Sequence, residues 1–330
     1  MAVSVNNLEK ADIAPTTLNA YLRRIDKLTS VTGNSIEWVM TNPQTTLKYI
    51  LGTISNNSAT IAGYISTICK LFSVNPQFKN LHRKHIEVWE KYLTHYRALE
   101  QERYKKSELS ERQLKNFVDW ETVSQMYCTL KKNPVTKTDI KANLRYLLLS
   151  LFLNMHAKRA DLGSVYIYQQ PPPLDKADHG NYIVMSQKII VLNTYKTASK
   201  RGAIKEPLNA ILMQDIQESL RLFPRDYLIV STRGEPYSND SYGKFVKRQC
   251  LLLFGKSMGV SIWRIVQIGA DVDFNYTSIQ DLERGAHFRG HSLAQEMLAY
   301  RKKPDSEGSS GINAFVQKRP KHEQGEPVVC

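Results

Sequence analysis

The first part of the chain carries apolar residues at the spacing of amphipathic helices. Between Thr16 and Asn75, apolar side chains recur every three or four residues, and after a break at Asn42-Pro43 the same spacing returns over Thr60–Phe72. A helix with this spacing has one apolar stripe, which it buries against its neighbours. The pattern therefore predicts a bundle of short helices over residues 1–98.

The apolar content falls in the segment that follows. Residues 99–116 are rich in Glu, Lys and Arg, which is typical of a connection between domains or of a solvated helix. We interpret the segment as a partly helical interdomain linker, with the solvated helix as an equal alternative. Strong helical spacing then returns over Phe117–Leu130 and Lys141–His156.

Short runs of β-branched and aromatic residues come next. They lie at 165–168, 181–186 and 188–193, separated by Pro171-Pro172-Pro173 and by Asp178-His179-Gly180, and they predict a small antiparallel sheet. Later helical patterns cover Ala210–Leu222, Ser241–Phe254 and Ile262–Ile268.

These patterns predict a fold that is mainly α with a small antiparallel β-sheet. An N-terminal helical bundle (1–98) is joined through a linker (99–116) to an α+β domain (117–303). Residues 304–330 are rich in Ser, Gly, Pro and charge, so we expect a flexible tail there.

The charge of the chain narrows the class of partner. It has 45 basic and 31 acidic residues, a net charge of +14 and a pI near 9.5, which favour a polyanionic partner. No stretch reaches the ~18 apolar residues that a membrane span needs, and the polar first residues lack the apolar core of a secretory signal. We therefore expect an intracellular protein that does not insert into a membrane.

The cysteines do not indicate a metal site. Cys69, Cys128, Cys250 and Cys330 are scattered without a CxxC pair, so the usual zinc spacings are excluded. We expect reduced thiols and no structural metal.

Five residues in the second half could together act on a phosphodiester. Arginine can bind two phosphate oxygens at once and keeps its charge. Tyrosine can form a covalent intermediate, and lysine can protonate a leaving oxygen. Residues of these kinds, with a histidine, occur in the order Arg159, Lys196, Arg264, His291 and Tyr300.

This order resembles that of the tyrosine recombinase (site-specific integrase) family, which presents Arg, Lys, His-x-x-Arg, His or Trp, and Tyr. The most specific element is Gly290-His291-Ser292 followed by Tyr300, nine residues after the histidine. Lys196-Thr197 after a strand is similar to the family's hairpin lysine, and the first helices are similar to its core-binding domain. Ser107–Trp120 resembles the interdomain region of integrases from large DNA viruses and eukaryotic mobile elements.

The resemblance implies a recombinase that cleaves and rejoins DNA through a 3′-phosphotyrosine, without metal or cofactor. Tyr300 would attack the phosphorus, Arg159 and Arg264 would stabilise its charge, His291 would donate a hydrogen bond to the phosphate, and Lys196 would protonate the leaving oxygen. Further contacts to the DNA are expected from basic neighbours of these residues: Lys158, Lys200, Arg201 and Arg289.

The resemblance also implies the assembly and the location. The partner would be double-stranded DNA, bound by a homotetramer in a synaptic complex and by a monomer or dimer when free. The protein would be associated with DNA, in the nucleus or a viral factory for a eukaryotic or viral source and in the cytoplasm for a prokaryotic one.

Two positions depart from the family pattern, and one spacing makes a structural demand. Ser261 stands where the family has the histidine of His-x-x-Arg, so only a hydroxyl is present there. The family's first arginine commonly precedes a carboxylate by three residues, and three before Asp161 is Lys158; we favour Arg159 because lysine lacks the bidentate fork. Nine residues would place His291 and Tyr300 on opposite faces of one helix, so a break between them is required.

Other interpretations remain for each residue and for the whole chain. Taken alone, Arg159 could pair with Asp161, Lys196 could lie in a solvated turn, and Tyr300 could be an ordinary half-buried aromatic. Tyr276 is the second candidate nucleophile and Tyr195 a weaker one. The competing functions are a non-catalytic DNA-binding relative, a type IB topoisomerase-like enzyme, and a basic helical protein without a site.

Overall fold

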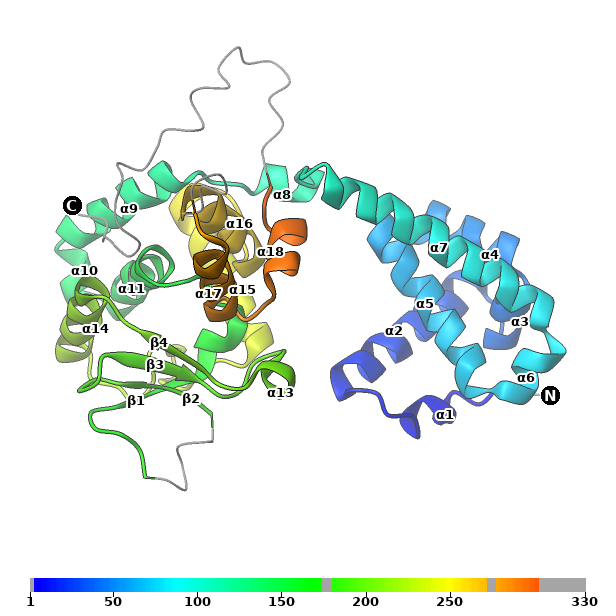
Figure 1. The fold of residues 1–330 in the computed structure, drawn as a ribbon, viewed down its shortest axis with the longest axis horizontal. Helices are drawn as coiled ribbons and strands as arrows, with labels where there is room; N and C mark the ends of the chain where they lie inside the picture. Colours follow the sequence, from blue (N-terminus) through cyan, green and yellow to red (C-terminus); the bar gives the residue numbers. More distant parts are fainter. Residues whose placement is uncertain (1–2, 174–179, 272–276, 303–330) are drawn as a thin grey trace, which may run out of the picture. The chain divides into compact units, whose positions relative to one another are not determined.

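A computed structural model describes residues 3–173, 180–271 and 277–302. The chain divides into two compact units, residues 1–106 and 107–330, and Figure 1 labels their elements. The division falls inside the segment expected to be the linker, and the helix that precedes it, α7, continues to Lys105. Among the described helices, none has both the length and the apolar character needed to cross a membrane.

The first unit is helical in its described residues. Its apolar core includes Ile65, Phe72 and Trp89, which are fully buried. Helix α5 packs against α7. The indole of Trp89 donates a hydrogen bond of 2.9 Å to the carbonyl of Met40. In chain order the elements are α1 (Asn6–Glu9), α2 (Pro15–Thr32), α3 (Ile36–Thr41), α4 (Pro43–Tyr49), a π-helical turn (Ile50–Ile54), α5 (Ser58–Val74), α6 (Pro76–Leu81) and α7 (Arg83–Lys105).

The second unit combines helices with one small sheet, and most of the helices gather on one side of that sheet (Figure 1). Its helices are α8 (Glu111–Lys115), α9 (Trp120–Lys132), α10 (Val135–Thr138), α11 (Ile140–Asn154), a 3-10 turn (Ala160–Ser164), α13 (Ala198–Arg201), α14 (Ala210–Leu222), α15 (Asn239–Phe254), α16 (Val260–Asp271), α17 (Ile279–Phe288) and α18 (Leu293–Ala299). Its strands are β1 (Val165–Tyr168), β2 (Asn181–Val184), β3 (Ile189–Leu192) and β4 (Ile204–Pro207).

The sheet is mixed, which corrects the expectation of a purely antiparallel one. Its strand order is β1-β2-β3-β4. The β2–β3 and β3–β4 pairs are antiparallel, but β1 and β2 run parallel, with Val165 opposite Asn181. A parallel pair requires a long connection, and the chain between Tyr168 and Asn181 is long enough to return to the starting end of β1.

The core of the second unit is built around α11. Nearly every residue of this helix is buried, and α9, α14 and α16 contact it. The rings of Phe152 on α11 and Trp263 on α16 stack with centroids 4.3 Å apart. Stacked aromatic pairs contribute about 0.5–1.5 kcal/mol beyond the area they bury. This packing fixes α16, which carries Arg264, against the end of α11.

The thiols differ from the expectation. Cys69 and Cys250 are free, but Cys128 is disulfide-bonded, so the expectation of reduced thiols is wrong at Cys128. The expected tail at 304–330 lies outside the described residues.

Candidate active site

Arg264 is a buried guanidinium at the centre of the site. It lies on α16 with 1% of its surface exposed. Its Nε donates to the carbonyl of Ala157 at 3.3 Å, one Nη donates to the carbonyl of Arg289, and the other donates to the phenolic oxygen of Tyr300 at 2.9 Å. Burial lowers its pKa. Within the described residues it forms no salt bridge to a carboxylate, and the charge of Asp161 partly compensates it from a greater distance.

His291 and Tyr300 come together because the chain breaks between them, as the nine-residue spacing requires. Helix α17 ends at Phe288, Gly290 takes a φ of +74°, and α18 begins after Ser292. A positive φ of this kind is strained for residues with a Cβ. His291 therefore precedes α18 and Tyr300 ends it, with ring centroids 5.0 Å apart. The Arg264 guanidinium carbon lies 5.2 Å from the Tyr300 ring.

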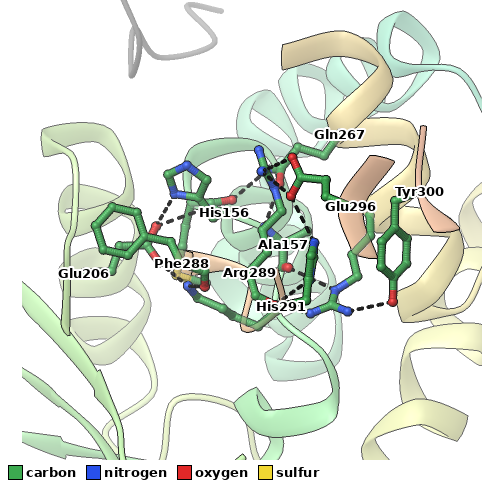
Figure 2. Close-up of polar contacts among 12 residues, drawn as sticks. His156, Ala157, Glu206, Gln267, Phe288, Arg289, His291, Glu296 and Tyr300 are labelled. Atoms are coloured by element: carbon green, nitrogen blue, oxygen red, sulfur yellow. Dashed lines mark hydrogen bonds and ion pairs between the residues drawn. The ribbon is translucent and has the colours of Figure 1, made fainter. Parts of the chain in front are cut away.

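A buried carboxylate holds the segment around His291. Glu296 is fully buried and accepts hydrogen bonds from Nη1 of Arg289, at 2.9 Å to each carboxylate oxygen. Nε2 of His291 lies 2.9 Å from one of these oxygens, and Nδ1 lies 3.2 Å from the carbonyl of Arg289. Figure 2 shows this network beside Tyr300. Both ring nitrogens of His291 therefore contact protein oxygens.

Arg289 does not fit the expectation of a direct DNA contact. Its side chain is 3% exposed and its guanidinium is committed to Glu296. Its Nη1 donates to both carboxylate oxygens of Glu296, so this nitrogen is not free for a phosphate in the described structure. The signal that favoured it, a basic residue next to Gly290-His291, does not distinguish exposed from buried arginines.

Lys158 is also buried, and its expected DNA contact is likewise incompatible with its position. Its ammonium donates to the carboxylate of Glu206 on β4 and to the carbonyl of Phe288. Burial raises the pKa of Glu206, but the charges of Lys158 and His156 outweigh that effect and lower it to about 2. The lysine thus links β4 to the end of α17.

Arg159 faces the site from the start of the 3-10 turn. It is half-buried, and its Nη1 is buried without a hydrogen-bond partner in the described structure. It is close enough to Arg264 for its charge to lower the pKa of that residue. Burial raises the pKa of the neighbouring Asp161 carboxyl, although Arg264 and Arg159 oppose this. Arg159 therefore has a guanidinium nitrogen without a hydrogen-bond partner in the described structure, whereas the ammonium of Lys158 is paired with Glu206.

Lys196 lies exposed in the turn between β3 and α13. The turn is anchored next to His291, because the hydroxyl of Thr197 donates to the carbonyl of Gly290 at 3.0 Å. The Tyr195 ring packs over Gly290, and its hydroxyl donates to the carbonyl of Gly202 at 2.7 Å. The lysine side chain therefore starts close to the site without a fixed partner in the turn.

The remaining predicted residues are placed as follows. Lys200 and Arg201 lie exposed on α13, where a backbone phosphate can reach them. Ser261 is exposed in the first turn of α16, three residues before Arg264, and so lies on the same side of that helix. Tyr276 lies outside the described residues.

Three residues of the site were not predicted from the sequence. Glu206 and Glu296 compensate buried cations, and the amide of Gln267 holds the segment before Lys158 through the backbone of Phe152, Met155 and Ala157. Gln267 offers a weak signal, since it is a polar residue inside an apolar helix. Within the described residues, no group of three or more His, Cys, Asp or Glu side chains is arranged to hold a metal ion.

Comparison with known proteins supports this architecture. No family model and no curated protein matches the chain. The crystal structure of XerA recombinase matches with a TM-score of 0.40 and 10% identity, over 91% of this chain and 92% of that chain. A lambda integrase dimer bound to a COC′ core site matches with a TM-score of 0.55 and 14% identity, over 91% of this chain and 77% of that chain. The second match shows that the chain shares the fold of that integrase, a tyrosine recombinase.

Proposed function

We propose that this protein binds double-stranded DNA and breaks and rejoins its strands through a covalent bond between DNA and Tyr300. The observation that carries the proposal is the contact between the Tyr300 hydroxyl and Arg264, a buried guanidinium without a carboxylate partner in the described structure. A charge of this kind favours an anion beside the phenol. A DNA phosphate is an anion that fits the +14 charge of the chain.

The residues around the phenol supply the other steps of the reaction. The Tyr300 oxygen attacks the phosphorus and loses its proton to solvent, and the bond from phosphorus to the 5′ oxygen breaks. Arg264 and Arg159 stabilise the charge on the non-bridging oxygens, a type of contact that is usually the largest catalytic contribution. Lys196, in its exposed turn, donates a proton to the departing 5′ oxygen. Attack by a 5′ hydroxyl on the phosphotyrosine reseals the strand.

The role of His291 changes with this geometry. Its two ring nitrogens already contact Glu296 and the carbonyl of Arg289, so donation to a phosphate would require one of these contacts to open. We propose that the ring supports Tyr300, which it packs against. The exposed hydroxyl of Ser261 is the remaining candidate for a direct hydrogen bond to phosphate.

We propose the assembly from the number of strands that the reaction must cut. Exchange between two DNA sites requires a cut on each of four strands, which a homotetramer supplies with one Tyr300 per strand. The free protein would be a monomer or dimer. Its location would follow that of the DNA it acts on.

A covalent-trapping assay tests the proposal. The protein is incubated with a pool of labelled duplexes that have a randomised core and a nick, so that cleavage releases a short fragment and traps the adduct. We expect a denaturant-resistant band whose tryptic peptide carries DNA on Tyr300 and which Tyr300→Phe does not form. Tyr195→Phe is the matched control and should keep the band.

Two of the three competing functions, the non-catalytic relative and the topoisomerase-like enzyme, give different results in this assay. DNA binding without an adduct in the wild-type protein would support the non-catalytic relative and overturn the enzyme proposal. If the adduct forms, a plasmid with one selected site and a plasmid with two sites separate the remaining cases. Relaxation of the first without recombination of the second would indicate the topoisomerase-like reaction.

A further inference from the structure

Glu296 contacts His291 through its side chain and Tyr300 through its backbone. Its carboxylate contacts Nε2 of His291 and the guanidinium of Arg289, and its backbone carbonyl accepts the amide of Tyr300 at 3.0 Å. The carbonyl of Arg289 in turn accepts a hydrogen bond from Arg264, which contacts the Tyr300 hydroxyl. These five residues form a closed ring of hydrogen bonds.

The burial of Glu296 also has a cost in free energy. A fully buried carboxylate is strongly disfavoured unless it is paired and hydrogen-bonded. Burial raises the pKa of Glu296, but the contacts with His291 and Arg289 outweigh this and lower it. The carboxylate is therefore ionised, and both of its partners have to stay in place to keep it so.

We propose that Glu296 is a positioning residue for the cleavage reaction, which sets the orientation of the His291 ring and the depth at which α18 places the Tyr300 hydroxyl beside Arg264. This inference rests on the proposed function for its effect on rate. Its structural part, the control of His291 by Glu296, holds or fails without DNA.

Charge and shape contribute separately to this role. The charged groups that face His291 are Glu296 from α18, Arg289 after α17 and Arg264 from α16. Burial lowers the pKa of His291, the hydrogen bond and charge of Glu296 raise it, and the two arginines lower it. Glu296→Gln removes the charge at nearly constant shape. Glu296→Asp keeps the charge but withdraws it by one methylene.

The first test uses DNA-free protein with nitrogen-labelled histidine, observed by NMR over a pH series, with His291 assigned from a His291→Asn sample. We expect Glu296→Gln to lower the pKa of His291 and Glu296→Asp to leave it closer to wild type. The matched control is Gln295→Ala, an exposed neighbour on α18, which should leave the His291 titration unchanged. An unchanged titration in both Glu296 variants would overturn the inference.

The second test measures the rate of adduct formation with the trapping substrate as a function of pH. We expect Glu296→Asp to slow the reaction by about 10²-fold, since displacement of a catalytic group by about 1 Å has an effect of that size, with DNA affinity within twofold of wild type. Wild-type rates in a folded Glu296→Asp protein would overturn the inference.

The two tests separate the possible failures. If no variant and no wild-type protein forms an adduct, the proposed function fails, while the NMR titration still decides whether Glu296 controls His291. If the adduct forms and the His291 titration does not respond, the function stands and the positioning role is wrong. If Glu296→Gln does not fold, the rate of adduct formation by Glu296→Asp decides the question.

Discussion

The Nη1 atom of Arg264 donates a 2.9 Å hydrogen bond to the hydroxyl oxygen of Tyr300, although the two residues are 36 positions apart, one on α16 and the other directly after α18. The same guanidinium also donates to two backbone carbonyls. Its planar fork therefore aims one N–H group at the proposed nucleophile and keeps the others fixed. Lysine has a single nitrogen and cannot make this set of contacts.

We therefore expect Arg264→Lys to lower the rate of adduct formation by about 10²–10³-fold, the usual effect of losing one preorganised donor. The measurement is single-turnover trapping at saturating DNA, which separates chemistry from binding. Arg221→Lys, at an exposed surface pair with Glu218, is the matched control. A rate within threefold of wild type for Arg264→Lys would contradict the assignment.

The exposed turn with Lys196 gives a chemical prediction. If Lys196 protonates the 5′ oxygen, Lys196→Met should slow cleavage by about 10²–10⁴-fold. In a substrate with sulfur in place of that oxygen, the leaving group is a thiolate, which needs no proton because thiols are much more acidic than alcohols. The variant should then react with this substrate at close to the wild-type rate. A defect of equal size on both substrates would show that Lys196 acts in another way.

The sequence was informative where the chain follows a regular period. The helices expected over 60–72, 141–156 and 210–222 are present as α5, α11 and α14, because apolar spacing indicates which face of a helix is buried. Strand β4 was missed, since Ile204-Lys205-Glu206-Pro207 has two charges and a proline. Helix α17 was missed because its residues are largely polar.

The candidate site divides in the same way. Order and spacing along the chain were enough to select Arg264, His291 and Tyr300, which the fold brings together. The partners Glu206 and Glu296 depend on contacts between distant elements, and nothing in their local sequence marks them as buried. Burial also distinguishes Lys158 from Arg159, because neighbouring side chains in an extended segment point in opposite directions.

Exposure on α13 leads to a prediction about DNA affinity. Lys200 and Arg201 are exposed there, so they can contact backbone phosphates and release counterions. Replacing both by Ala should weaken binding to all sequences alike and reduce the slope of log Kd against log salt by about one for each residue. Fluorescence anisotropy over a salt series measures this slope. Lys244→Ala, at an exposed pair with Asp240, is the control, and an unchanged slope in the double variant would remove α13 from the interface.

The buried pair of Lys158 and Glu206 makes stability depend on both partners. Removing one member of such a pair leaves a buried charge without compensation and costs about 3–5 kcal/mol, whereas replacing both with apolar residues is often close to neutral. We expect Lys158→Met to lower the free energy of unfolding by that amount and Lys158→Met/Glu206→Leu to recover most of it. Urea unfolding measures both. Additive losses in the double variant would contradict the pairing.

The same pair predicts a pH dependence at the acid end. The pKa of Glu206 is lowered from 4.5 to about 2, so the folded protein releases this proton more readily than the unfolded chain. The resulting stabilisation is fully present above the unfolded pKa and is lost as the pH falls from about 4.5 towards about 2. The difference in unfolding free energy between wild type and Glu206→Gln should therefore be largest near neutral pH and shrink over that interval. Glu218→Gln, at an exposed surface pair, controls for surface carboxylates and should show little change. A wild-type advantage that persists undiminished at pH 2 would mean that Glu206 is not the ionised partner of Lys158.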